Sequence, residues 1–288
     1  MDGLSFWLGF ITASLLWFLY QYARKIWPHL RQDFENRTAS IRTARAVNLE
    51  DRLRKRILQQ AQGYHLAAPL FALDEICIPP KLLCPLPQVD PNNPLQADDL
   101  VSQTISYLPD WPEFGSHFGI RTLDLQTPFI DGSRVAIAGH PGSGKSTALA
   151  YLASQIIRKE TQNPNLDALF PVLFHILDLP KPYPSHGDTL KPILDGFCST
   201  KQSSTSSQEQ AFLRSKLHAG NLLLLLDGLD ELSNQEYKEA LEFLERLLNQ
   251  YPQLKITITL SFENWNGVAA LGIKPFSLAG WNAEEGER

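Results

Sequence analysis

The sequence predicts an α/β protein in which helices cover both faces of a parallel sheet. From residue 133 on, short apolar segments alternate with segments of helical periodicity, which is typical of this class. The segment NLLLLLD at 221–227 is apolar almost throughout, as expected of a strand that is buried on both faces. A glycine-rich segment, GHPGSGKST at 139–147, lies between one such strand and a helix.

The first expected element is a transmembrane helix. Residues 4–22 contain no charged residue, and this length of 19 residues matches the roughly 20 that a helix needs to cross a bilayer. Asp2 precedes the segment whereas Arg24 and Lys25 follow it, so the positive-inside rule places the rest of the chain in the cytoplasm. A cleaved signal peptide and a buried core helix are the alternatives, but large aromatic and basic residues occupy the region where a signal peptide would be cleaved. We therefore expect residues 1–23 to be the single-pass anchor of a cell-membrane protein.

Residues 24–77 are expected to form a basic helical stalk. Apolar residues recur with helical spacing at Ala46, Leu49, Leu53, Ile57 and Ala61. Basic residues surround this stripe, and three environments remain open for the helix: anionic lipid headgroups, solvent, or a partner protein. Residues 78–112 are rich in proline, which lacks an amide hydrogen and continues neither helices nor central strands. This segment is expected to be a linker, and 113–288 to be the next domain.

The elements of this domain follow from its apolar pattern. Helices are expected at 145–158, 208–218 and 234–250. The polar segment at 199–208 is expected to be a loop. His175 lies within an apolar segment and is interpreted as a core histidine. Strands are expected at 134–139, 170–177, 221–227, 254–260 and 273–278.

The composition argues against several classes of function. The formal net charge is −5, but residues 1–60 carry +5 and the remainder carries −10. An acidic domain argues against a nucleic-acid groove, because such binding depends strongly on the neutralisation of phosphates. The three cysteines do not form a disulfide framework, and neither they nor the seven histidines have the spacing of metal ligands.

The segment GHPGSGKST fits G-x-x-x-x-G-K-[ST], the pattern of a phosphate-binding loop. Its glycines permit a close approach to phosphate, and its backbone N–H groups form an anion cradle with the start of the next helix. Lys145 is expected to reach the β- and γ-phosphates and the Ser146 hydroxyl to bind Mg²⁺. The expected binding residues are Gly139, His140, Pro141, Gly142, Ser143, Gly144, Lys145, Ser146 and Thr147.

The segment LLLLLDGLDEL at 222–232 predicts the other half of an NTPase site. Asp227 ends the strand and is expected to hold Mg²⁺ together with Ser146. A carboxylate of Asp230 or Glu231 is expected to orient or deprotonate the attacking water. The expected catalytic residues are therefore Lys145, Asp230 and Glu231, and the expected cofactors are ATP or GTP with Mg²⁺.

These two motifs, with the segment FPVLFHILDL between them, resemble the NACHT branch of the signal-transducing (STAND) P-loop ATPases. The resemblance covers about residues 108–278. It implies a three-layer core of the ASCE type with strand order 5-1-4-3-2, preference for ATP, and a switch between a closed ADP form and an oligomeric ATP form. Membrane-anchored chains of this type look bacterial, and several bacterial relatives take part in defence against phage.

The sequence departs from this family in three places. Many relatives have glutamate where this chain has His140. Relatives carry an arginine after the strand at 254–260, whereas here Ser261 is followed by Phe262. Because such an arginine is worth about 10³-fold or more in rate, hydrolysis is expected to be slow or lost. Relatives also continue into helical and winged-helix modules, so a sequence that ends at Arg288 is expected to be a minimal form or a piece of a longer protein.

The sequence favours a membrane-tethered signalling switch that binds Mg-ATP and hydrolyses it slowly to ADP and phosphate. The alternative is a scaffold that binds nucleotide without hydrolysis, or retains only a degenerate site, and acts through its anchor. A transporter ATPase would need further membrane spans, and a kinase of small metabolites fits the acidic pair less well. The expected partners are the nucleotide, the membrane, and either a second copy of the chain or another signalling protein.

Overall fold

The chain divides into two compact units, residues 1–53 and 54–288. In the first unit the structure, a computed structural model, describes Trp17 and residues 47–53, which are helical. In the second it describes residues 54–65, 67–68, 70–83, 122–129, 134–184, 187–199 and 206–280. No helix within these ranges is long and apolar enough to span a membrane. The expected anchor at 4–22 lies outside them, except for Trp17.

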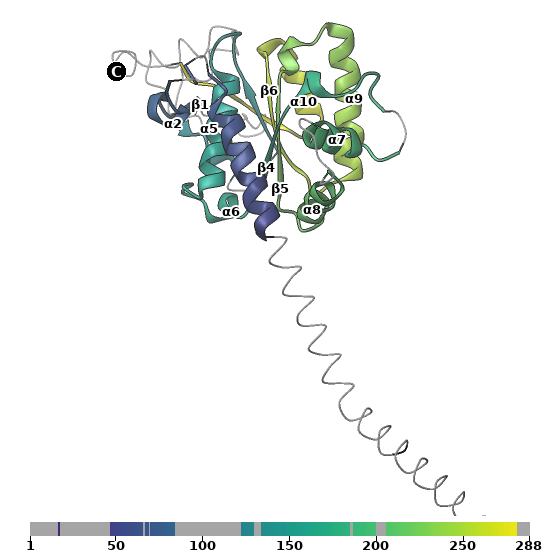
Figure 1. Ribbon diagram of the computed structural model, residues 1–288. Helices are drawn as coiled ribbons and strands as arrows, with labels where there is room; N and C mark the ends of the chain where they lie inside the picture. Colours follow the sequence, from purple (N-terminus) through teal and green to yellow (C-terminus); the bar gives the residue numbers. More distant parts are fainter. Residues whose placement is uncertain are drawn as a thin grey trace, which may run out of the picture. The chain divides into compact units, whose positions relative to one another are not determined.

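The core of the second unit is a five-stranded parallel sheet (Figure 1). The strands lie in the order β4-β5-β6-β3-β7, and every neighbouring pair is parallel. Strand β6 therefore separates β3, which leads into the glycine-rich loop, from β5, which ends in Asp227. The strands are β3 (Val135–Ala138), β4 (Phe170–His175), β5 (Leu222–Asp227), β6 (Lys255–Leu260) and β7 (Lys274–Ser277).

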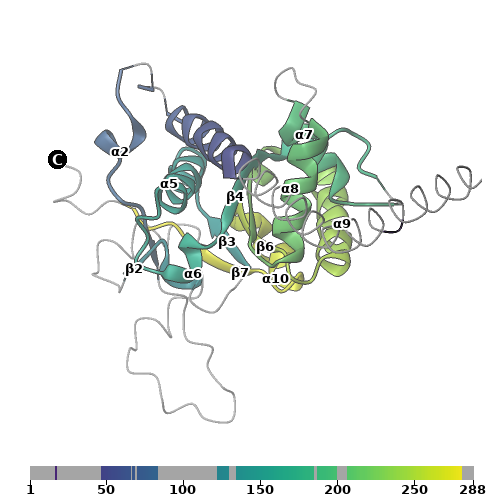
Figure 2. The same ribbon diagram turned by 60° about the horizontal axis from the view of Figure 1, so that its bottom comes forward.

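Helices lie on both faces of this sheet. Helices α5 and α6 lie on one face, and α7, α8 and α9 on the other (Figures 1 and 2). Because both faces are covered, every residue of β3 and β5 is buried. The predicted parallel α/β architecture is thereby confirmed. The helices are α5 (Lys145–Arg158), α6 (Pro164–Asp167), α7 (Lys191–Ser199), α8 (Ser206–His218), α9 (Asn234–Gln250) and α10 (Trp265–Ala270).

The bounds predicted for α5 and α9 are confirmed, because each helix has clear local signals. Helix α9 begins after a capping box in which Ser233 and Glu236 exchange side-chain and backbone hydrogen bonds. Helix α7 was not predicted, because Pro192 and Gly196 give its sequence the appearance of a loop. Gly196 is needed there, since a Cβ atom would lie 2.8 Å from the Phe174 ring of β4.

The segment before the sheet belongs to the same hydrophobic core. Residues 47–62 are helical and are followed by the short helix α2 (Leu73–Ile76). Ala61 and Leu73 are buried in one cluster with Ile137 of β3 and Leu152 of α5. The part of the expected stalk from Arg54 on is therefore packed into the compact unit that carries the sheet.

Polar contacts tie this segment to three other elements. Arg56 Nη1 lies 3.1 Å from Glu209 Oε2 of α8, and Gln60 donates a hydrogen bond to the Leu173 carbonyl of β4. Asp74 of α2 accepts a hydrogen bond from Ser154 and pairs with Arg158, both in α5. The guanidinium group of Arg56 thus forms an ion pair within the chain rather than with lipid headgroups.

The proline-rich segment also contains a strand. β1 (Lys81–Leu83) pairs antiparallel with β2 (Thr122–Asp124), and both precede the sheet in sequence. An isolated bridge joins Leu82 to Leu278, just after β7. The start of the expected linker at 78–112 therefore lies against the edge of the domain, and the rest of that linker lies outside the described residues.

Candidate functional site

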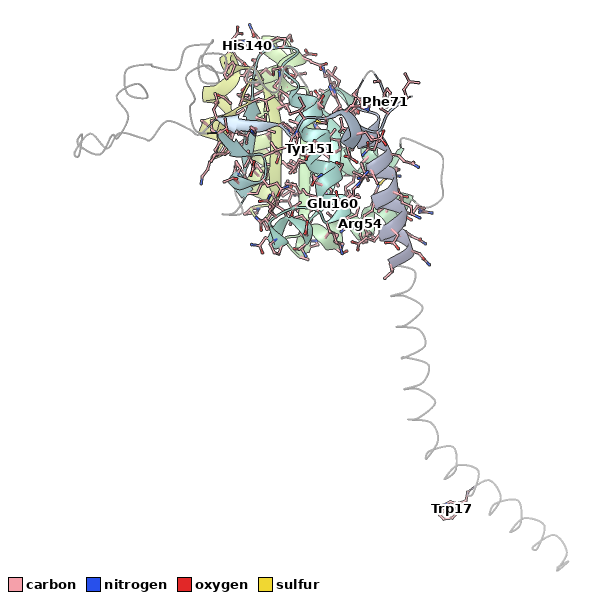
Figure 3. The ribbon with its side chains drawn as sticks, turned by 90° about the vertical axis from the view of Figure 1, so that its left-hand side faces the viewer. Trp17, Arg54, Phe71, His140, Tyr151 and Glu160 are labelled. Atoms are coloured by element: carbon pink, nitrogen blue, oxygen red, sulfur yellow. The ribbon has the colours of Figure 1, made fainter. Side chains whose placement is uncertain are left out.

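The glycine-rich loop connects the carboxyl end of β3 to the start of α5. Figure 3 shows His140 of this loop at the outer end of the domain. Gly142 and Gly144 have φ angles of 79° and 90°, a region that side chains disfavour. The Ser143 amide donates a hydrogen bond to the His140 carbonyl at 3.1 Å, which closes the turn. At Gly139 a Cβ atom would lie 2.5 Å from Ser143 Oγ, so a larger residue there would displace the Ser143 side chain.

Lys145 is held inside this loop by three oxygen atoms. Its Nζ atom donates to the carbonyl oxygens of Gly139 at 3.1 Å and His140 at 2.9 Å. The same atom lies 2.9 Å from Oδ2 of Asp230, which follows β5. Because the lysine side chain is only 6% exposed, its charge needs such partners. The structure thus joins the two sequence motifs through this ion pair.

Asp227 lies buried at the carboxyl end of β5, with 3% of its surface exposed. Its Oδ1 accepts a hydrogen bond of 2.6 Å from Thr259 Oγ1 of β6, which in turn accepts one from the Gly228 amide. None of the ion pairs within the described residues involves Asp227. A buried carboxylate without a basic partner favours a bound cation, and carboxylate and hydroxyl oxygens are ligands that Mg²⁺ accepts. The donor set of Asp227 and Ser146 therefore fits this ion.

Glu231 is paired with a histidine that the sequence did not assign to the site. His175 ends β4 opposite Asp227 in the register, and its Nε2 lies 3.4 Å from Glu231 Oε1. Its Nδ1 accepts a hydrogen bond from the Leu177 amide. The interpretation of His175 as a core histidine is wrong, because its side chain is 22% exposed and faces the acidic turn. No signal in the sequence marked this position, because the predicted strand continued to residue 177 whereas β4 ends at His175.

The position expected for an arginine is occupied by an aromatic contact with the loop. The Phe262 ring, which follows β6, lies edge-to-face with the His140 ring at a centroid distance of 5.0 Å. Two of the three places where this sequence departs from the related pattern are therefore in contact with each other. Hydrophobic and edge-to-face attraction replaces the charge that an arginine would supply.

A cavity of about 590 Å³ opens beside the loop. One wall consists of loop residues 139–144 and Thr147, and the other consists of residues 76–81 and 278–280. The second wall is mostly apolar, with Ile76, Ile78 and Pro79. His65, Lys81 and His140 line the cavity, and no Asp or Glu is among the described residues that do so. The cavity therefore suits a ligand with an apolar ring and an anionic group.

Sequence reasoning missed this second wall. Nearly all of residues 108–122, where the segment that resembles the family begins, lies outside the described residues. The wall that the structure does describe, residues 76–81, falls in the segment that was expected to be stalk and linker. No local sequence pattern indicates it, because a bridge between Leu82 and Leu278 and a hydrogen bond from the Ala279 amide to the Lys81 carbonyl hold it beside residues 278–280.

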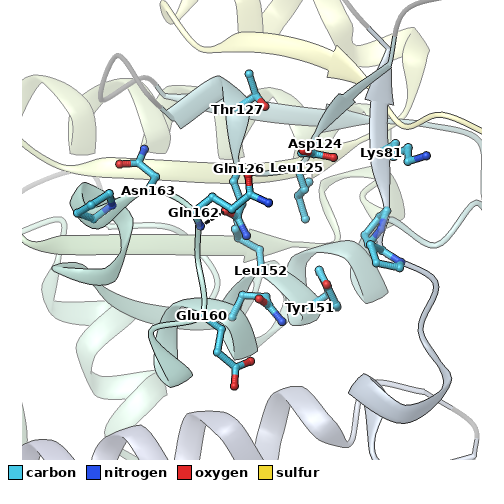
Figure 4. Close-up of a pocket in the computed structure, with 14 residues that line it drawn as sticks. Lys81, Asp124, Leu125, Gln126, Thr127, Tyr151, Leu152, Glu160, Gln162 and Asn163 are labelled. Atoms are coloured by element: carbon cyan, nitrogen blue, oxygen red, sulfur yellow. Dashed lines mark hydrogen bonds between the residues drawn. The ribbon is translucent and has the colours of Figure 1, made fainter.

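A second cavity of about 670 Å³ lies between α5, α6 and β2 (Figure 4). Its lining includes the carboxylates of Asp124 and Glu160 and the amides of Gln126 and Gln162. Gln126 Oε1 accepts a hydrogen bond of 2.8 Å from the backbone amide of Gln162. The two carboxylates would repel a polyphosphate. The smaller cavity beside the loop is therefore the better candidate for a nucleotide, although it is not the larger of the two.

A parallel sheet, a glycine-rich loop that encloses a lysine, and a buried aspartate two strands away define the class of P-loop nucleotide-binding domains. Within this class, the NACHT domain family matches residues 133–285, more than half of the chain. The chain belongs to the NACHT family, which implies nucleotide binding and NTPase chemistry, usually with Mg²⁺. No curated protein matches the chain.

Proposed function

We propose that this chain is a membrane-tethered switch that binds Mg-ATP and hydrolyses it slowly. The observation that carries the proposal is the buried position of Lys145, inside the loop and next to the acidic turn after β5. In ATP-binding proteins of this class the corresponding lysine binds the β- and γ-phosphates. The cavity beside the loop supplies an apolar wall for a base and basic side chains near the phosphates.

The described contacts support different proposed roles for the two carboxylates of the acidic turn. Asp230 is engaged by Lys145, so we propose that it holds this lysine until a nucleotide competes for the same cation. Glu231 is 53% exposed and contacts His175, so its carboxylate is free to move toward a water molecule. We therefore propose Glu231 as the general base, oriented by His175, and Asp227 with Ser146 as the residues that hold Mg²⁺.

Nucleotide binding and phosphate release by the full chain in detergent test this proposal. Lys145→Ala is expected to weaken ATP binding by about tenfold or more, because it removes the cation that faces the phosphates. Glu231→Gln is expected to bind ATP normally and to lose about 10²-fold or more in turnover. An unchanged affinity in Lys145→Ala would contradict the assignment of the site.

The alternative function, a nucleotide-binding scaffold without hydrolysis, is favoured by one observation. Phe262 and His140 place an aromatic pair where an arginine would stabilise the transition state. Binding of Mg-ATP without phosphate release in the wild-type chain would favour this alternative. Both functions include the membrane anchor, which we propose from residues 4–22. A chain that begins at residue 24 is expected to leave the membrane fraction, and its retention there would contradict the anchor.

A further inference from the structure

The turn that follows the helix at 47–62 carries a histidine without an assigned role. His65 lies in this turn and lines the 590 Å³ cavity together with loop residues 139–144 and Thr147. It lies far outside the segment 133–285 that matches the NACHT family. No motif contains it, so only the tertiary structure brings it to the loop.

Among the described residues, the imidazole of His65 has no hydrogen-bond partner. Both ring nitrogens are buried, and neither has a hydrogen-bond partner among the described residues. Each imidazole nitrogen is a donor or an acceptor, and a buried polar atom without a partner is unfavourable. The ring can turn about its Cβ–Cγ bond, since this torsion has broad minima. Such a rotation would bring a nitrogen to the cavity that the ring already lines.

The surroundings of His65 favour an anionic partner. The described lining of the cavity contains no carboxylate, and its ionisable groups are His65, Cys77, Lys81 and His140. The apolar stretch at 76–80 lies on the other wall and suits a nucleobase.

We propose that His65 donates a hydrogen bond to a phosphate oxygen of the bound nucleotide. The proposal rests on the nucleotide site described above and adds a positioning residue from the segment that precedes the family match. The contact gives one of the two buried ring nitrogens and a phosphate oxygen a partner, and it links the bound nucleotide to the turn after the helix at 47–62. A nucleobase contact is the competing assignment, which the test below separates.

The test compares His65→Ala and His65→Gln with wild type in the full chain in detergent. A fluorescent ADP analogue is displaced with ADP, ATP, inorganic triphosphate and adenosine. For His65→Ala we expect about fivefold to tenfold weaker binding of ADP, ATP and triphosphate, and an unchanged affinity for adenosine. His65→Gln is expected to recover part of this loss, because its amide nitrogen remains a donor.

His218→Ala is the matched control. His218 is exposed at the end of α8, directly before the amino end of β5, whereas the loop follows the carboxyl end of β3. Its binding is expected to equal that of wild type. Equal affinity of wild type and His65→Ala for all four ligands would overturn the role of His65, and so would a loss confined to adenosine. A wild-type chain that binds none of the four ligands would overturn the proposed function itself.

Discussion

The Nζ atom of Lys145 lies 2.9 Å from Oδ2 of Asp230, and both side chains are largely shielded from water. The pair joins the residue that opens α5 to the turn after β5, which is two strands away in the sheet. If Lys145 binds phosphate, its ammonium group must either contact Asp230 and the phosphate oxygens together or leave Asp230 for the phosphate. Asp230 then competes with the nucleotide for the same cation.

Replacing Asp230 by asparagine tests this competition. The substitution removes a negative charge near the phosphates and releases Lys145, so ATP is expected to bind about threefold to tenfold more tightly. Titration calorimetry at constant ionic strength measures the effect. Glu263→Gln, which removes an equal charge just after β6, is the control. Weaker binding in Asp230→Asn would mean that the carboxylate frames the site rather than competing for it.

Phe262→Arg tests whether a missing charge limits turnover. The Phe262 ring contacts His140 of the loop, so an arginine at this position is expected to reach the phosphate region. Phosphate release is expected to rise by about tenfold or more, part of the 10³-fold that such an arginine contributes elsewhere. Phe262→Lys provides a charge without the planar guanidinium and should gain less. No gain in Phe262→Arg would show that the position does not face the transferred phosphate.

Gly228→Ala is expected to destabilise the domain for two separate reasons. Gly228 has a φ of 87°, and a Cβ atom there would collide with the His175 ring. Strain and overpacking together are expected to lower the free energy of unfolding by about 2 kcal/mol or more. Gly220→Ala, at a φ of 70° with open space around it, should lose only about 1 kcal/mol.

The double variant His175→Ala/Gly228→Ala separates the two causes. Removing the imidazole relieves the collision and leaves the backbone strain, so part of the stability is expected to return. Chemical denaturation of the four chains gives the coupling free energy. A coupling near zero would mean that the loop shifts to accommodate the methyl group.

Asp74 is expected to hold the segment 54–83 to α5. It accepts hydrogen bonds from Gln62 and Ser154 and pairs with Arg158. Asp74→Ala removes these contacts and is expected to lower the free energy of unfolding by about 1–3 kcal/mol. Asp51→Ala, at an exposed helical position, is the control. Equal unfolding midpoints for the two variants would show that apolar packing alone holds the segment.

The start of α9 gives the protein a defined response to acid. Hydrogen bonds from Lys181 and Ser233 lower the pKa of Glu236 from its ordinary 4.5 to about 2. The stabilisation is therefore present above pH 4.5 and is lost as the pH falls through the window toward 2. Glu236→Gln should show a smaller loss of melting temperature across this window, whereas Glu239→Gln should behave like wild type. Parallel acid curves for Glu236→Gln and wild type would contradict this role.

The sequence by itself determined the parts whose signals are local. Periodicity and a capping box predict α9, and the run of leucines predicts β5, because burial on both faces requires apolar residues throughout. The loop from Gly139 to Thr147 is predicted because only glycines permit its backbone conformation. Lys145 and Asp227 were predicted because each occupies a set position in a short sequence motif.

Only the tertiary structure decided the contacts between distant segments. His175 faces Glu231 because strand register, which no local pattern encodes, places β4 beside β5. His65 and residues 76–81 reach the glycine-rich loop because residues 54–65 and 70–83 belong to the same compact unit as the sheet, although their sequences suggest a stalk and a linker. The local sequence determines the backbone conformation of a segment and which of its side chains are buried, because both depend on the residues of that segment. Which side chains meet across the chain depends on how the packed elements share one core.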